Sequence, residues 1–202
     1  MIKKKLADLN SSAILMSAEE LFESKGFENT TMDDIALRTG VTKPTIYVYF
    51  KNKQLIWDSI ACKHMELLLQ DAIKAAESTE NFENRYYTLC FDIAEKFESH
   101  PVFYKATLGK ISMDMEQEIY KKIYEIGEQT NEVIAAFIRS GIEEGVVRKD
   151  IDVYPTVLMM WSSISGIISM AIDKEEYLEL RFGMNKKDYL EKAFKMLLEG
   201  AL

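Results

Sequence analysis

Apolar residues recur along this chain at the three- and four-residue spacing of amphipathic helices. The first such stripe consists of Ile14, Ala18, Leu21 and Phe22. Gly26 follows the stripe at the position of a left-handed C-cap, so we predict a first helix over residues 12–25. Nowhere do apolar and polar residues alternate in the manner of a half-buried strand. The pattern therefore predicts an all-α protein.

Three further helices are expected at short intervals after the first. Thr31 is an N-cap residue followed by two aspartates, which the helix dipole favours in a first turn, and this second helix ends at Gly40. Thr42 begins a third helix, in whose first turn Pro44 costs no hydrogen bond. Asn52 begins a fourth helix with a long apolar stripe. Three short helices thus lead into a long one.

The rest of the chain also has helical periodicity. We predict helices over residues 86–99, a short piece ending at 109, 112–144, 152–172 and a last one that includes 190–198. The apolar segment Val157–Ile172 contains four serines and is shorter than the roughly 20 residues that cross a membrane. We therefore expect this segment to be buried in the protein and predict no membrane partner.

Composition and charge indicate a cellular setting and a kind of partner. The 202 residues are 48% hydrophobic and 29% charged, as in soluble globular proteins. Cys62 and Cys90 lie far apart and follow no secretory signal, so we expect reduced thiols in the cytoplasm. The net charge is -8, yet the segment through Lys53 has eight basic and seven acidic residues, against 17 and 26 beyond it. This asymmetry predicts that a polyanion binds near the N-terminal end.

Residues 31–50 have the pattern of a helix-turn-helix, in which the second helix enters the DNA major groove. With Ile46 and Phe50 facing the core, steps of 100° per residue place a second set of side chains outside. That set consists of Lys43, Thr45, Tyr47, Val48 and Tyr49. The tyrosines offer hydroxyls to phosphate oxygens, while Val48 and Pro44 offer apolar surface to thymine methyl groups. Lys53 opposes the dipole of the helix that it starts, which favours a phosphate beside it.

The stretch Ala18–Ile56 closely resembles the N-terminal domain of tetracycline-repressor-like (TetR family) transcription regulators. It matches the pattern LF…KGF…TT…DIA…GV…TIY.YF.NK..L in order and spacing. The resemblance implies two groups of DNA contacts. The positions that read bases at the start of the recognition helix are Thr42, Lys43, Pro44 and Thr45. The positions that contact the phosphate backbone are Thr31, Tyr47, Tyr49 and Lys53.

The remaining chain agrees with this family in helical layout. The resemblance implies a small, largely apolar effector, and we assign its contacts to Phe97, Tyr104, Tyr120, Tyr124 and Trp161. It also implies a homodimer formed by the apolar helix after residue 152 and the last helix, although burial of these helices within one subunit is an open alternative. The predicted architecture is a helix-turn-helix DNA-binding domain over residues 1–53, joined by the long fourth helix to an effector-binding and dimerisation domain over 54–202.

The sequence therefore predicts a transcriptional repressor that binds a palindromic double-stranded DNA operator as a dimer and is released by an effector. We expect no cofactor, no catalytic residues and no metal site, because no catalytic motif occurs and His64 and Glu66 do not share a helix face. Two alternatives are a DNA-binding regulator without a small-molecule effector and a helical enzyme.

Overall fold

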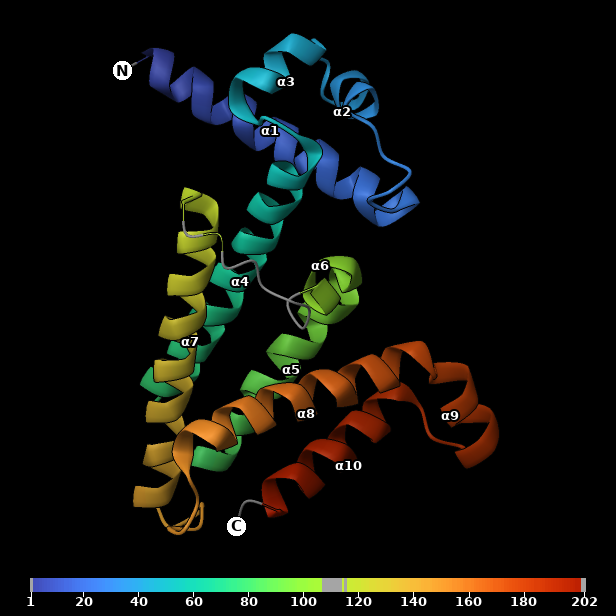
Figure 1. Ribbon diagram of the computed structural model, residues 1–202. Coiled ribbons are helices and arrows are strands. Elements are labelled where there is room, and N and C mark those ends of the chain that lie inside the picture. The colour runs from blue at the N-terminus through green and yellow to red at the C-terminus, as the bar shows by residue number, and fades with distance from the viewer. Residues whose placement is uncertain (1, 107–113, 115, 201–202) are drawn as a thin grey trace. The chain divides into compact units, whose positions relative to one another are not determined.

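The computed structural model describes residues 2–106, 114 and 116–200, and this part of the chain contains ten α-helices and no strand (Figure 1). The helices are α1 (Ile2–Lys25), α2 (Met32–Thr39), α3 (Lys43–Tyr49), α4 (Lys53–Glu77), α5 (Phe82–Ser99), α6 (Pro101–Ala106), α7 (Glu118–Glu143), α8 (Val153–Asp173), α9 (Glu175–Phe182) and α10 (Lys186–Glu199). The predicted all-α class is confirmed.

The predicted caps set most of the early helix boundaries. At the start of α2, the Asp34 backbone N–H donates to Thr31 Oγ1 (3.1 Å), and the Thr31 N–H donates to the Asp34 carboxylate (2.8 Å). This reciprocal pair is a capping box, which satisfies two helix-end donors at once. Gly26 and Gly40 have φ of 82° and 78°, the left-handed conformation expected for both. The side chain of Asn52 accepts from the Leu55 N–H at 2.8 Å and so begins α4 as predicted.

Two helices begin earlier than the sequence pattern predicted. Helix α1 begins at Ile2 rather than at residue 12, because its first part is rich in lysine, leucine and alanine, which favour helix without an apolar stripe. Helix α5 begins at Phe82 rather than at residue 86, because the Asn81 side chain caps it through the Asn84 N–H (2.9 Å).

Two differences concern the later helices. Helix α7 begins at Glu118, and the expected helix boundaries at 109 and 112 lie outside the described residues. Helix α9, which ends in Gly183 with φ 61°, was not predicted. Its apolar residues are spread around the helix without a stripe, so periodicity gives no signal for it.

The chain divides into two compact units. Unit 1 comprises residues 1–64 and 100–123, and unit 2 comprises 65–99 and 124–202. Unit 1 therefore contains α1, α2, α3, α6 and the first parts of α4 and α7. The division at residues 53 and 54 into a DNA-binding and an effector domain concerns function and stays a prediction.

Unit 1 is built around an apolar and aromatic core. The buried members are Ile14, Ala18, Phe22, Ile35, Ala36, Ile46, Phe50, Ile56, Ile60 and Phe103. The Phe22 ring lies edge-on to Trp57, with 5.4 Å between ring centroids, and Trp57 in turn packs on Phe103 at 4.7 Å. Such aromatic pairs add stability beyond the area that they bury. Because Ile46 and Phe50 both lie in this core, the opposite side of α3 is left outside, as predicted.

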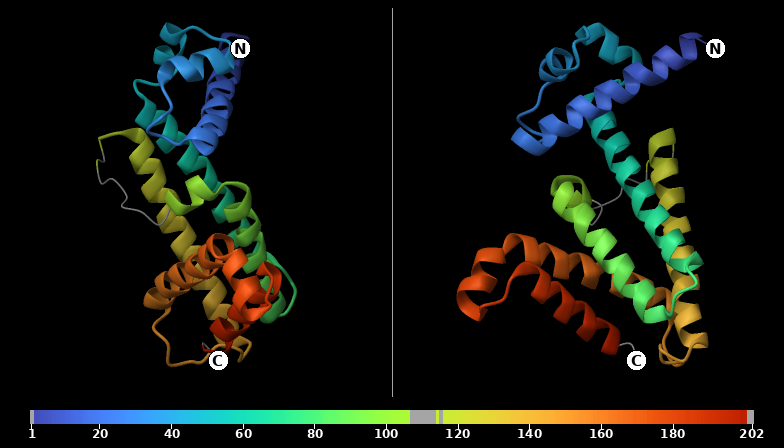
Figure 2. Two further views of the ribbon diagram at one scale, coloured as in Figure 1. Left: turned by 90° about the vertical axis from the view of Figure 1, so that its right-hand side faces the viewer. Right: turned by 180° about the vertical axis from the view of Figure 1, so that it is seen from behind.

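In unit 2, α8 runs beside α10 in both views of Figure 2 and also contacts α5 and α9. Among the described residues, α8 is the one helix long and apolar enough to cross a membrane by length and composition. Its inner face, with Ile164, Ile168 and Ala171, is buried, but only 28% of its apolar window is buried within the chain, so the expectation that residues 157–172 are buried is met on one face alone. Its outer face leaves Leu158 and Met159 exposed in the single chain.

Candidate DNA-binding site

The outer side of α3 presents a short row of exposed side chains. Val48 is 79% exposed and Tyr47 is 46% exposed, whereas the neighbouring Ile46 points into the core and is fully buried. Pro44 is exposed in the first turn of α3, where it lacks no helix donor. The row therefore combines apolar surface and a phenol hydroxyl on a helix held by a packed core, which is the composition that DNA bases and phosphates can both contact.

The start of α3 carries the polar side chains that were assigned to base reading. Lys43 Nζ lies 2.8 Å from the Asp33 carboxylate on α2. The hydrogen bond to Asp33 raises the pKa of the Lys43 ammonium, so this group is charged at neutral pH. Thr42 precedes α3 as its N-cap residue but makes no side-chain cap, since its hydroxyl pairs with that of Thr45 at 2.8 Å. Both hydroxyls and the ammonium are partly exposed and can exchange these partners for a base edge.

Tyr49 is tied to the N-terminal helix. The Asn10 amide donates to the Tyr49 hydroxyl at 3.1 Å. A phenol that accepts through its oxygen still has its own proton to donate. The geometry of Tyr49 is therefore compatible with donation to a phosphate oxygen, and Thr31, which caps α2, lies exposed at the other helix start.

Lys53 has a set of contacts that sequence reasoning missed. Its Nζ donates to the carbonyls of Phe27 (2.5 Å), Thr30 (2.8 Å) and Glu28 (3.4 Å) and lies 4.2 Å from the centroid of the Phe27 ring. An ammonium has three protons to donate, so these carbonyls can use all of them. The placement of Lys53 at the start of α4, where its charge opposes the helix dipole, is therefore explained by its hydrogen bonds to the loop between α1 and α2. Its contact with a DNA phosphate stays a prediction.

The five residues assigned to the effector fall into both units. Tyr104 and Tyr120 belong to unit 1, and Phe97, Tyr124 and Trp161 belong to unit 2. Phe97 and Tyr104 are fully buried, whereas Tyr124 is 43% exposed. The Tyr120 hydroxyl donates to Asp58 at 2.8 Å, and this hydrogen bond raises the pKa of Tyr120. Their shared role in an effector site stays a prediction.

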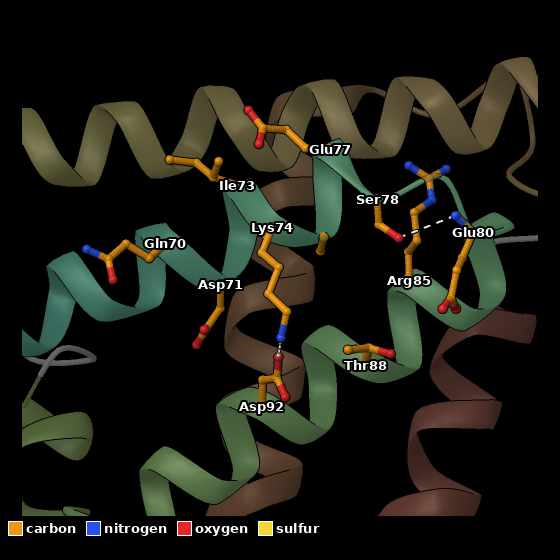
Figure 3. Close-up of a pocket in the computed structure, with 11 residues that line it drawn as sticks. Gln70, Asp71, Ile73, Lys74, Glu77, Ser78, Glu80, Arg85, Thr88 and Asp92 are labelled. Atoms are coloured by element: carbon orange, nitrogen blue, oxygen red, sulfur yellow. Dashed lines mark hydrogen bonds and ion pairs between the residues drawn. The ribbon is translucent and has the colours of Figure 1, made fainter.

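A pocket of about 500 Å³ lies in unit 2 between α4 and α5, and none of these five residues lines it (Figure 3). Lys74 points across it to the Asp92 carboxylate, at 3.2 Å. Arg85 also lines it and is buried, and its side chain pairs with Glu144. Much of the lining is therefore charged, and sequence periodicity gave no indication of it, because the lining residues lie on two helices and on the segment between them.

A second polar cluster lies in unit 1 and has residues that could hold a cation. One ligand atom each from Glu19, His64 and His100 lie within 4.8 Å of one another. His64 is 1% exposed and lies 2.6 Å from Glu19, through its Nε2. The sequence gave no sign of this cluster, because 45 and 81 residues separate Glu19 from the two histidines. The expectation of no metal site looked for ligands at close spacing in the sequence, such as His64 with Glu66, and did not pair either histidine with Glu19.

An exposed row of DNA-compatible side chains on the second helix of a packed helix-turn-helix defines a DNA-binding protein. Residues 14–58 match the family model described as bacterial regulatory proteins, tetR family. The chain is 30% identical over 138 residues to the HTH-type transcriptional regulator YhgD of Bacillus subtilis, which covers 66% of this chain and 67% of that protein. The chain belongs to the TetR family and is a DNA-binding transcriptional regulator, not an enzyme.

Two further relatives extend the comparison. The chain is 25% identical over 128 residues to IcaR of Staphylococcus aureus, a negative transcriptional regulator of the biofilm operon icaADBC, with 61% of this chain and 67% of that protein covered. The fold matches the crystal structure of FadR from Bacillus subtilis in complex with stearoyl-CoA, with a TM-score of 0.72, 18% identity, and 94% and 98% of the two chains covered. Regulators of this family bind DNA operators as dimers and bind small molecules.

Proposed function

We propose that the protein is a repressor that binds a palindromic operator as a homodimer and is released by a small effector. The observation that supports this most directly is the exposed face of α3, with Tyr47 and Val48 outside and Ile46 in the core. Two such helices in a dimer would read half-sites about 34 Å apart, in successive major grooves. IcaR, to which the chain is similar, is also a negative regulator of transcription. The proposed place of action is the cytoplasm.

Within this proposal the contacts divide into two kinds. Thr42, Lys43, Pro44, Thr45 and Val48 read base edges, and Thr31, Tyr47, Tyr49 and Lys53 contact the phosphate backbone. Base contacts determine sequence preference, whereas phosphate contacts determine affinity and its salt dependence. The two groups therefore make different predictions for substitution.

The proposed dimer uses the outer faces of α8 and α10. Leu158 and Met159 on α8 and Met196 on α10 are exposed apolar side chains, and α8 and α10 contact each other in unit 2. Apolar side chains that gather on one face of a single chain mark a surface for a partner. Isologous contact between the same faces of two chains would cover them and close the assembly at two subunits.

The proposed effector is small and largely apolar. FadR, whose fold this chain shares, was solved with stearoyl-CoA, which makes long-chain acyl thioesters the first class to test. Release requires that the effector prefers the state that does not bind DNA, and a change from 1:99 to 99:1 needs about 5.5 kcal/mol of differential affinity. The second candidate function is a regulator that responds to no small molecule. The charged lining of the pocket in Figure 3 favours it, because such a lining does not suit a largely apolar effector.

The test is selection of bound sequences from a random pool of duplex DNA by the purified full chain, at one stated salt concentration. A palindrome with half-sites about one helical turn apart is the expected result. Lys43→Ala should then relax preference at particular base pairs, while Lys187→Ala, an exposed lysine of α10 in unit 2, should change nothing. Selection of unrelated, non-palindromic sequences would refute the proposal that the protein binds a palindromic operator as a dimer.

The effector is tested on the selected operator. Stearoyl-CoA and matched acyl chains of other lengths are added to the preformed complex, with coenzyme A alone as the control for its nucleotide part. Release by the acylated compound alone supports an apolar effector. Release by coenzyme A equally would contradict it, and no release by any compound would favour the regulator without this class of effector.

A further inference from the structure

The chain has two histidines, and unit 1 brings both of them to one buried carboxylate. His64 on α4 lies 2.6 Å from Glu19 on α1, and His100, at the start of α6, lies 3.6 Å from the same Glu19 oxygen. The two imidazole rings are 4.8 Å apart between centroids. A buried ionised carboxylate requires a cation or several hydrogen bonds nearby to offset its lost hydration.

The carboxylate is held in its ionised form. Burial would raise the pKa of the Glu19 carboxyl, but hydrogen bonds from His64 and Lys63 outweigh burial and lower the pKa to about 2. Lys63 Nζ contacts the second carboxylate oxygen at 3.1 Å, and its side chain is 50% exposed. One oxygen of Glu19 is thus occupied by a lysine at the surface, and the other faces the two imidazoles.

We propose that Glu19, His64 and His100 bind a divalent first-row transition-metal ion. Two imidazole nitrogens and one carboxylate oxygen are a donor set suited to Zn²⁺, and a fourth position stays open for water or another ligand. Donor atoms around a tetrahedral Zn²⁺ lie about 3.3 Å apart, given metal–donor distances of about 2.0–2.1 Å. The three ligand atoms lie within 4.8 Å of one another, so side-chain movements of about 1 Å suffice.

The surroundings of the cluster resemble the outer contacts of protein metal sites. His64 Nδ1 lies 3.1 Å from the buried Tyr104 hydroxyl. When Nε2 binds the ion, Nδ1 carries the proton and donates it to Tyr104, which fixes the tautomer and the ring orientation. The ionised Glu19 carboxylate can only accept a hydrogen bond, so in the metal-free state Nε2 carries a proton towards it, and the ion would displace that proton. His100 Nδ1, the nitrogen 3.6 Å from Glu19, also lies 2.8 Å from the Glu23 carboxylate, and an ion bound at Nδ1 would replace this contact.

The ion would join three elements of unit 1. Glu19 lies on α1, His64 on α4 and His100 just before α6. Helix α1 also supplies core residues beneath the recognition helix, so the bound ion would restrain α1 against α4 and α6 without involving the pocket of unit 2.

The test uses the purified full chain after dialysis against a chelator, titrated with Zn²⁺ in competition with a chromophoric chelator. We expect one saturable equivalent, weakened more than about tenfold by His100→Gln and by Glu19→Gln, and about tenfold by Tyr104→Phe. Glu20→Gln is the matched control, since Glu20 is the exposed neighbour of Glu19 on α1 and pairs with Arg38. Circular dichroism of each variant confirms that it is folded. His100→Gln is the main variant, because the His100 side chain is 38% exposed and its loss should leave the core intact.

Co²⁺ gives an independent readout. A four-coordinate Co²⁺ site with nitrogen ligands has a visible absorption band, which should appear in the unmodified chain and in Glu20→Gln and be absent in His100→Gln. Absence of saturable Zn²⁺ binding by the unmodified chain would overturn the proposal. So would equal Zn²⁺ affinity of Glu19→Gln, His100→Gln and Glu20→Gln, since both histidines of the chain belong to the proposed site.

Discussion

Replacement of Lys53 by methionine separates the structural and the DNA-binding roles of this side chain. Methionine keeps an apolar stem of similar length and removes the ammonium, which donates to the carbonyls of Phe27, Thr30 and Glu28. A hydrogen bond from a charged group contributes about 1.5–3 kcal/mol when its partner stays buried. Phe27 and Glu28 are partly exposed, so their carbonyls can be rehydrated, whereas Thr30 is buried; we expect a net loss of about 1–3 kcal/mol in the free energy of unfolding.

Lys51→Met is the matched control, because Lys51 is an exposed lysine two residues away and its loss removes the same charge from the same region. Urea unfolding of both variants gives the stability difference. If Lys53→Met and Lys51→Met unfold at the same urea concentration, the loop carbonyls do not depend on Lys53 and our structural reasoning is wrong.

Salt dependence of operator binding then tests the phosphate contact. A lysine that neutralises one phosphate contributes about 0.9 to the slope of log affinity against log salt. We expect Lys53→Met to lower the slope by about one relative to Lys51→Met, if the ammonium leaves the carbonyls for a phosphate in the complex. An equal slope for the two variants would refute the phosphate role while leaving the loop role intact.

Three other predictions concern stability and assembly. Thr31→Ala removes the capping box of α2 and should cost about 1 kcal/mol in urea unfolding. Gly141→Ala places a Cβ 2.6 Å from the Phe82 ring and should lower the free energy of unfolding by about 1–3 kcal/mol. Gly127→Ala on the same helix meets nothing closer than 4.0 Å and should raise it by about 0.5–1 kcal/mol. Equal melting temperatures of the two variants would contradict the packing. Leu158→Glu puts a charge on the proposed dimer face, where Leu158 is 62% exposed, and should shift sedimentation from dimer to monomer, while an unchanged dimer would exclude that face.

Helix positions and the inner and outer sides of α3 could be predicted from sequence because their causes are local. The stripe of α1, the cap at Thr31 and the left-handed glycines at 26 and 40 act within a few residues of themselves. The burial of Ile46 and Phe50 followed from the same periodicity. Helix α9 escaped prediction because it has no apolar stripe.

The cluster of Glu19, His64 and His100 could not be predicted in this way. Its members lie on three elements, and no spacing rule applies across the chain segments that bring them together. The contacts of Lys53 could not be predicted for a similar reason. Its acceptors are backbone carbonyls 23 to 26 residues away, and because every residue has such a carbonyl, the sequence does not mark the ones that bind. Sequence reasoning explained this lysine by an external phosphate, whereas the fold supplies internal acceptors.

Three cations in or beside the helix-turn-helix share one property that bears on DNA recognition. Lys25, Arg38 and Lys43 each pair with a carboxylate of unit 1, at 2.9, 2.5 and 2.8 Å. A cation whose charge is already offset by a carboxylate attracts a phosphate less strongly, so each contact yields less net free energy than a free lysine would. When paired cations add little to the affinity, a larger share of the discrimination between base sequences falls to the neutral side chains assigned to base edges, such as Thr45 and Val48.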